Sequence, residues 1–309
     1  MTREEVSTEL GRMEFTTGQI LGISGRILFE NMGMWLLFSL VVFLPTGALL
    51  QALSLQIPTK ELLKMLQEGN LDILSRQDLL KPILVMNGAQ VLLMFVHVLT
   101  NIAACLFTDK WLQKSAALPT IGILAEDTLK KWPRALLITL IYILGVAGYL
   151  LFTVLTASFG LVFLLLFALI LLAAYWSFLY YYSVSATSIR PYVGMAAFKF
   201  ASSMIRRRTS LAIGLILTCI LINALFSALL QLLTTSFTVL IVHPVLLCVA
   251  SGLVSVVANL PNFLISIAAT IYLVNQEQFS LQITAGMNPV PETEDIDPFI
   301  DPDDFSKKA

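Results

Sequence analysis

Charged residues are scarce in this sequence. Asp, Glu, Lys and Arg together make up 13% of the 309 residues, whereas hydrophobic residues make up 57%. Average soluble domains carry about 25% charged residues. A chain this apolar cannot cover a water-facing surface with polar groups, so we expect a lipid bilayer to be part of its solvent.

Residues that support catalysis or metal binding are also few. The sequence has two histidines and three cysteines, Cys105, Cys219 and Cys248, and they show no spacing typical of a metal site. The odd number of cysteines, all within or beside apolar stretches, disfavours structural disulfides. No glycine-rich phosphate-binding motif occurs. We therefore expect no cofactor, no metal and no enzymatic activity.

Four long stretches contain no Asp, Glu, Lys or Arg: residues 31–59, 82–108, 135–189 and 209–276. A helix needs about 20 apolar residues to cross a bilayer. The first two stretches each fit one span, and the last two each fit a pair joined by a tight turn. Turns are expected at residues 156–160 and at His243-Pro244, because proline cannot continue a helix.

The sequence thus predicts an all-α polytopic membrane protein with six transmembrane helices. The predicted spans are residues 33–55, 83–107, 135–156, 160–182, 211–235 and 247–274. A cytoplasmic N-terminal segment (1–32) precedes the six-helix domain (33–275), and an acidic, disordered cytoplasmic tail (287–309) follows it.

Basic residues predict the orientation. They cluster before the first, third and fifth spans, whereas the two tight turns contain none. Cytoplasmic loops carry the excess of Lys and Arg, and 15 of the 19 lie inside if the N-terminus is cytoplasmic. Both termini are therefore expected in the cytoplasm. No cleavable signal peptide is expected, so the first span would act as an uncleaved anchor.

The three segments before the odd-numbered spans look alike. Residues 119–125 and 191–197 share Pro-x-(Ile/Val)-Gly-(Ile/Met)-x-Ala, and residues 15–21 are similar. Apolar residues at helical spacing and then basic residues follow, which predicts three repeats of an amphipathic helix plus a helical hairpin. The apolar face of each amphipathic helix is expected in lipid. The alternative is that these segments are ordinary connectors.

The basic residues of these segments are candidates for binding anionic lipid headgroups of the inner leaflet. They are Lys130, Lys131, Arg134, Arg206, Arg207 and Arg208. The arginine run is short and lies next to a span, which favours a headgroup contact over nucleic-acid binding.

Two segments carry a family resemblance. Thr17-Gly18-Gln19-Ile20-Leu21 with Arg26–Asn31, and residues 196–206, resemble the membrane domain attached to some bacterial glycerophosphodiester phosphodiesterases and to related inner-membrane proteins. The resemblance implies a six-helix domain in a bacterial cytoplasmic (inner) membrane. It does not imply a phosphodiesterase, because the catalytic barrel of those enzymes has no counterpart here. The neutral stretch 183–189 also departs from the family, in which an acidic residue is common there.

Uncharged polar residues recur at intervals of three or four residues in the second, fifth and sixth spans. Such side chains are costly in lipid and turn toward the interior of a bundle. The candidate interior residues are Asn87, Gln90, His97, Asn101, Asn223, Gln231, Asn259 and Asn262. They indicate either hydrogen bonds between helices or a hydrated cavity for a lipid headgroup or a polar solute.

The C-terminal tail is strongly acidic, with seven acidic residues and no basic residue between positions 292 and 304. Sequence of this kind is disordered on its own. It is either a solvated tail or a linear motif that docks on a basic cytoplasmic protein; exclusion from the anionic leaflet is a third alternative. The candidate motif residues are Asp297, Pro298, Phe299, Asp301, Asp303, Asp304 and Phe305.

Two functions fit these features. The first is a non-enzymatic membrane scaffold or assembly protein that organises lipid and binds partners on its cytoplasmic side. The second is a lipid or small-solute transporter, or a subunit of one, that uses the polar faces of spans 2, 5 and 6. No acidic residue lies inside any predicted span, which disfavours an ion-coupled carrier.

Overall fold

The computed structural model describes residues 2–10, 12–58, 77–113, 117–157, 162–240 and 243–287, and every regular element in these ranges is an α-helix. The all-α class is therefore confirmed for the described residues. The helices are α1 (Arg3–Glu9), α2 (Thr17–Glu30), α3 (Met32–Ser54), α5 (Gln77–Leu112), α6 (Ile121–Ala157), α7 (Val162–Ile189), α8 (Met195–Arg207), α9 (Thr209–Leu240), α10 (Pro244–Ala258) and α11 (Leu260–Met287).

Within the described residues, five helical segments are long and apolar enough to cross a membrane. They are Met32–Ser54, Leu80–Leu112, Ile121–Gly148, Thr209–Leu230 and Pro244–Gln282. These segments match the first, second, third, fifth and sixth predicted spans, so the membrane character is confirmed. The fourth predicted span falls on α7, where the side chains of residues 162–174 lie outside the described set. The fourth span, the total of six spans and the orientation stay predictions.

The short helices before the odd-numbered spans differ from one another. A single residue, Asn31, separates α2 from α3, and Arg208 alone separates α8 from α9. By contrast, α6 runs without interruption from Ile121 to Ala157 and contains Pro133. A separate amphipathic helix was expected before the third span, and the structure joins it to the span instead. The three-fold repeat stays a prediction.

The sixth predicted span is divided in two at Asn259. His243 is the N-cap of α10 and Pro244 is its first residue, as expected for a proline that begins a helix. Asn259 caps the C-terminus of α10, and α11 begins at Leu260 with Pro261 in its first turn. A proline lacks the amide hydrogen that would continue the helix and clashes with the preceding turn. Pro261 therefore explains the break.

The chain divides into two compact units. The first unit comprises Met1–Glu30, Asn101–Cys219 and Leu264–Ala309, and the second comprises Asn31–Thr100 and Ile220–Phe263.

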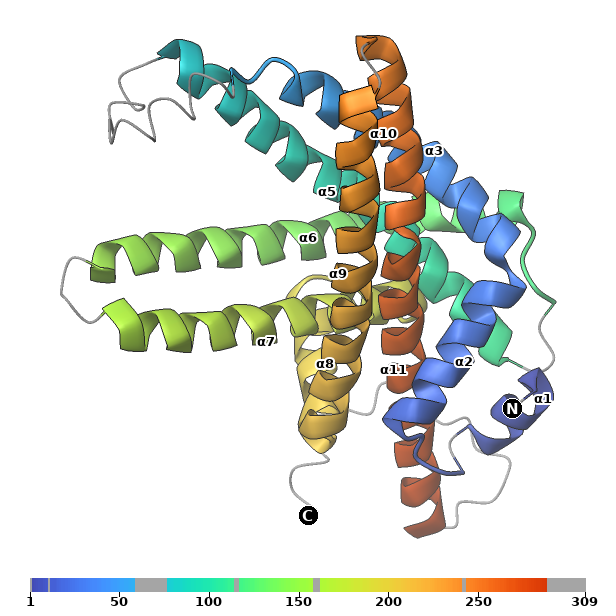
Figure 1. Ribbon diagram of the computed structural model, residues 1–309. Coiled ribbons are helices and arrows are strands. Elements are labelled where there is room, and N and C mark those ends of the chain that lie inside the picture. The colour runs from blue at the N-terminus through green and yellow to red at the C-terminus, as the bar shows by residue number, and fades with distance from the viewer. Residues whose placement is uncertain are drawn as a thin grey trace. The chain divides into compact units, whose positions relative to one another are not determined.

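In the first unit, α6 and α7 run antiparallel and side by side (Figure 1). The ring of Trp176 on α7 stacks on that of Phe198 on α8, with centroids 5.2 Å apart. Two buried tyrosines link further helices. Tyr182 of α7 donates a hydrogen bond to the carbonyl of Ala212 on α9, and Tyr272 of α11 donates one to the carbonyl of Met204 on α8.

The apolar face of α8 is part of the core of this unit. Phe198, Ala201 and Ile205 are buried, while Lys199 and Arg206 are exposed. The apolar face of α2 is likewise buried at Ile20 and Ile27. Other parts of the protein cover both faces, whereas the sequence predicted that they face lipid. Their apolar side chains gain the same release from water by packing on neighbouring helices.

In the second unit, α3 and α10 pack closely. A methyl group at Gly252 would lie 2.7 Å from the backbone oxygen of Leu44, and one at Gly47 would collide with Ser255. Small residues of this kind let two helices approach closely inside a membrane. Phe43, Val42 and Val256 form a small buried cluster beside this contact.

Candidate functional site

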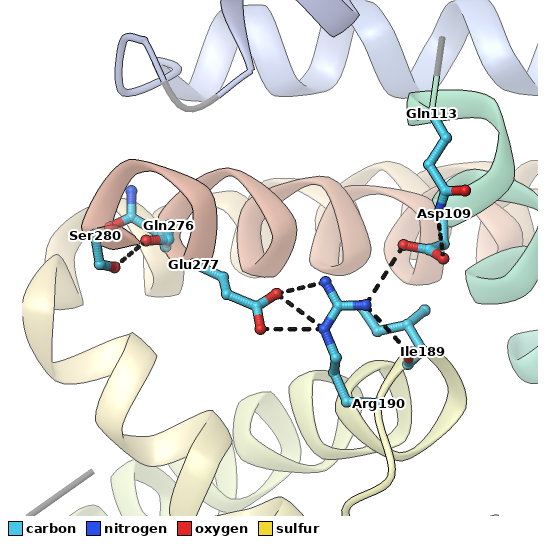
Figure 2. A network of polar contacts seen from close by, with 7 residues as sticks. All are labelled: Asp109, Gln113, Ile189, Arg190, Gln276, Glu277 and Ser280. Atoms are coloured by element: carbon cyan, nitrogen blue, oxygen red, sulfur yellow. Dashed lines mark hydrogen bonds and ion pairs between the residues drawn. The ribbon is translucent and has the colours of Figure 1, made fainter. Parts of the chain in front are cut away.

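Three charged residues from three different parts of the chain meet in the first unit. Asp109 lies in the last turn of α5, Arg190 follows the end of α7, and Glu277 lies in α11. Arg190 donates from Nε to both oxygens of Glu277 at 3.0 and 3.1 Å, and from Nη2 to Oε2 at 2.6 Å. Its Nη1 lies 3.9 Å from Oδ1 of Asp109 (Figure 2). We call these three residues the charged cluster.

Small buried residues lie on α5 and α11 just before the charged cluster. Ile-Ala-Ala occurs at residues 102–104 of α5 and again at 267–269 of α11, and all six residues are completely buried. The next residue on each helix, Cys105 or Thr270, contacts the hydroxyl of Ser185 on α7 at 3.3 or 3.2 Å. These contacts join α5, α7 and α11 one to two turns before their charged residues.

The charged cluster is largely shielded from water. The side chains of Asp109, Arg190 and Glu277 are 15%, 28% and 22% exposed. Burial by itself would lower the pKa of Arg190, but its hydrogen bonds to Glu277 and the two negative charges outweigh burial and raise that pKa. Gln113 donates to the second oxygen of Asp109 at 3.0 Å. All three charges are thus engaged with partners inside the protein.

A pocket of about 310 Å³ lies beside the charged cluster. Its lining residues are Ser7, Leu10, Asp109, Leu112, Gln113, Arg190, Val274 and Gln278. The N-terminal helix α1 closes one side, because Arg3 donates to the backbone carbonyls of Lys110, Trp111 and Gln113 at 2.8–3.1 Å. Carbonyls at a helix end have no partner within the helix, so Arg3 satisfies the end of α5 and fixes α1 against it.

Sequence reasoning missed the charged cluster. Asp109, Arg190 and Glu277 each directly follow a charge-free stretch, and of the three only Arg190 entered the argument, as a basic residue of a cytoplasmic loop. The repeated Ile-Ala-Ala was a usable signal, because small residues at equivalent points of two spans favour close helix contact. The pairing itself joins positions 87 residues apart and leaves no mark in the local sequence.

The predicted polar residues are divided between the two units. In the second unit, Asn223 donates to Asn262 at 2.9 Å, and Asn262 donates to Asn259 at 2.7 Å. These bonds link α9 to the start of α11. His97 lies 3.3 Å from the hydroxyl of Thr46, and Asn101, in the first unit, accepts from Ser266 at 3.1 Å.

A second pocket, of about 400 Å³, lies wholly within the second unit, and we call it the polar pocket. Its lining residues are Gly47, Leu50, Gln51, Ser54, Met86, Gln90, Ser227, Leu230, Ser251, Val254, Ser255, Ala258 and Asn259. Two predicted residues, Gln90 and Asn259, are among them. Asn87 lies exposed on α5, and the side chain of Gln231 lies outside the described residues.

The candidate headgroup residues have different surroundings. Lys130 is exposed and pairs with Glu126 at 2.7 Å. Arg134 and Arg206 are exposed, and Lys131 is half-buried. Arg207 contacts Ser280, and Arg208 forms an ion pair with Glu14.

The structure gives no metal site within its described ranges, since no three His, Cys, Asp or Glu side chains gather there closely enough to hold an ion. The acidic tail motif of Asp297, Pro298, Phe299, Asp301, Asp303, Asp304 and Phe305 lies outside the described residues.

Comparison with protein-family models, with curated proteins and with solved structures found no match. The resemblance of residues 15–31 and 196–206 to a phosphodiesterase-associated membrane domain therefore stays a prediction.

Proposed function

We propose that this protein is a non-enzymatic membrane scaffold that organises lipid and assembles partner proteins at its cytoplasmic side. The observation that carries the proposal is the charged cluster. Its carboxylates and guanidinium are engaged with one another, so they hold three helices together and offer no activated group for chemistry. A tightly packed unit of this kind acts through the side chains on its outer surface.

The exposed side of α8 provides one such surface. Lys199 and Arg206 are exposed, while the opposite face of the helix is buried in the unit. The charges are therefore held in place by packing that does not depend on lipid. Each basic residue near an anionic leaflet contributes about 1 kcal/mol of attraction. We assign this surface to anionic headgroups of the cytoplasmic leaflet.

The tail provides the second surface in this proposal. Its run of acidic residues between positions 292 and 304 is interrupted by Pro298 and Phe299 and is followed by Phe305. Acidic segments of this kind fold on basic partners and take their specificity from the aromatic residues. We assign the tail to a basic cytoplasmic protein.

Affinity purification from native membranes tests the scaffold. The full chain is compared with a chain that ends at residue 286 and with Arg206→Glu. Loss of partner proteins from the shortened chain, and loss of co-purified anionic lipid from Arg206→Glu, are the expected results. An unchanged partner list in the shortened chain, or no partner in either, contradicts the proposal.

The polar pocket favours a second candidate, a transporter of lipid or of a small solute. Four helices, α3, α5, α9 and α10, line it at positions that fall within candidate membrane spans. Gln90→Leu together with Asn259→Leu should then abolish transport by reconstituted protein without unfolding it. Full activity in the double variant excludes this use of the pocket.

A further inference from the structure

The polar pocket contains hydrogen-bonding groups that nothing in the described part of the chain satisfies. The side chains of Gln51, Gln90, Ser227 and Ser251 line it and have no hydrogen-bond partner there. Ser251 is 8% exposed, and its hydroxyl oxygen is buried. Ser255 and Asn259 differ, since they bond to the backbone of α10 and to Asn262.

The surroundings make these groups costly. All the lining residues lie in candidate membrane spans, and their neighbours Leu49, Leu229 and Leu253 point outward with about half or more of their surface exposed. Lipid tails offer no hydrogen bonds, so a polar side chain that faces them needs a partner from elsewhere. The pocket is therefore an incomplete hydrogen-bonding site that opens among lipid-facing residues.

The lining determines the chemistry of that partner. Among the described residues that line the pocket there is no Asp, Glu, Lys, Arg or His, which disfavours a charged headgroup because a charge there would stay uncompensated. The amides of Gln51 and Gln90 and the hydroxyl of Ser251 both donate and accept, which suits hydroxyl and ester groups. Leu50, Met86 and Leu230 provide apolar contact for the start of an acyl chain.

One wall of the pocket is fixed by the packing of α3 against α10. Gly47 and Ser255 lie in the close contact between α3 and α10, and both also line the pocket. This wall cannot relax without separating the two helices. A volume of about 400 Å³ falls within the range of about 300–1,000 Å³ that is usual for small-molecule sites.

We propose that the polar pocket binds the uncharged glycerol-ester region of a neutral membrane lipid, of diacylglycerol chemistry, which enters sideways from the bilayer. The ester and hydroxyl oxygens bond to Gln90 and Ser251, and the acyl chains extend past Leu230 to the lipid. This site lies in the second unit, whereas the scaffold proposal rests on the first unit and the tail. One can therefore fail while the other holds.

Photo-crosslinking tests the site. The full chain is placed in phosphatidylcholine nanodiscs with a trace of diacylglycerol that carries a diazirine near the carboxyl end of one acyl chain. After irradiation, labelled residues are mapped by mass spectrometry. Labelling should concentrate at residues 47–54, 86–90, 227–230 and 251–259. Labelling spread evenly over the exposed leucines of all spans overturns the proposal.

Variants and a second probe sharpen the result. Ser251→Ala and Gln90→Leu should each reduce labelling about three- to tenfold, the usual effect of losing one hydrogen bond. Ser39→Ala is the matched control, because the Ser39 hydroxyl is also buried and unpaired in the same unit but does not line the pocket. Melting curves confirm that each variant is folded.

Phosphatidylglycerol with the same diazirine chain is the second probe. It should label these residues several-fold less than the diacylglycerol does. Equal labelling by both probes, or equal labelling of Ser251→Ala and Ser39→Ala, overturns the assignment to a neutral lipid.

Discussion

Arg190 and Glu277 form a bidentate ion pair between the end of α7 and α11, across 87 residues of the chain. Asp109 completes the cluster from α5. The pair joins segments that are far apart in the sequence. The completely buried Ile-Ala-Ala tripeptides of α5 and α11 lie one to two turns before the charged residues, next to Cys105 and Thr270, which both contact Ser185 of α7. Shielded ion pairs of this kind stabilise little relative to an apolar core, but losing one partner is costly.

Arg190→Met should destabilise the first unit by about 3–5 kcal/mol, because it leaves two shielded carboxylates without a counter-charge. Denaturation of the detergent-solubilised protein, followed by tryptophan fluorescence, measures the loss. Arg134→Met is the control, since Arg134 is exposed and carries the same charge. Adding Glu277→Met and Asp109→Met to Arg190→Met should restore much of the stability. Equal stability of the two arginine variants contradicts the structural role of the cluster.

Arg3→Ala should loosen the end of α5. The variant loses the hydrogen bonds from Arg3 to the carbonyls of Lys110, Trp111 and Gln113. Bonds to a charged donor contribute about 1.5–3 kcal/mol, so local opening should rise at least about tenfold. Hydrogen exchange of a peptide that covers residues 107–113 reports this opening. Arg12→Ala, at an exposed position of the same segment, should leave the exchange unchanged.

Gly252→Ala should destabilise the second unit, because the new methyl group would lie 2.7 Å from the backbone oxygen of Leu44 and would force α3 and α10 apart. Overpacking of this kind costs about 1–3 kcal/mol. Gly88→Ala is the matched control on α5, where a methyl group meets nothing within 4 Å. Alanine is the better helix former, so this control should be neutral or slightly stabilising. Similar melting temperatures for both variants would be incompatible with the close packing.

The helical class and the apolar spans could be predicted from the sequence, because the absence of charge over long stretches is a property of each segment alone. The start of α10 at Pro244 could also be predicted, because it depends on the local sequence alone. The break at Asn259 was missed although Pro261 was visible, because the apolar run continues unchanged on both sides of it.

The sites were harder to predict, because they depend on contacts between segments that are distant in the chain. Periodicity indicated that Asn223 and Asn262 both face other helices, and the structure pairs them. It could not indicate that Asn101 bonds to Ser266 in one unit while Asn259 lines a pocket in the other. The apolar faces of α2 and α8 read as lipid-facing because amphipathicity does not distinguish lipid from protein as the apolar partner.

The orientation predicted from the basic residues can be tested with single cysteines. Replacing Cys105, Cys219 and Cys248 by alanine, and then introducing Thr59→Cys or Ser306→Cys, gives one reactive thiol on either predicted side. In intact spheroplasts, a membrane-impermeant maleimide should label Thr59→Cys and leave Ser306→Cys unlabelled until the membrane is opened. Inverted vesicles should give the opposite pattern. The reverse result would place Lys199 and Arg206 on the outer face, away from the anionic leaflet, and would contradict both surfaces of the proposed scaffold.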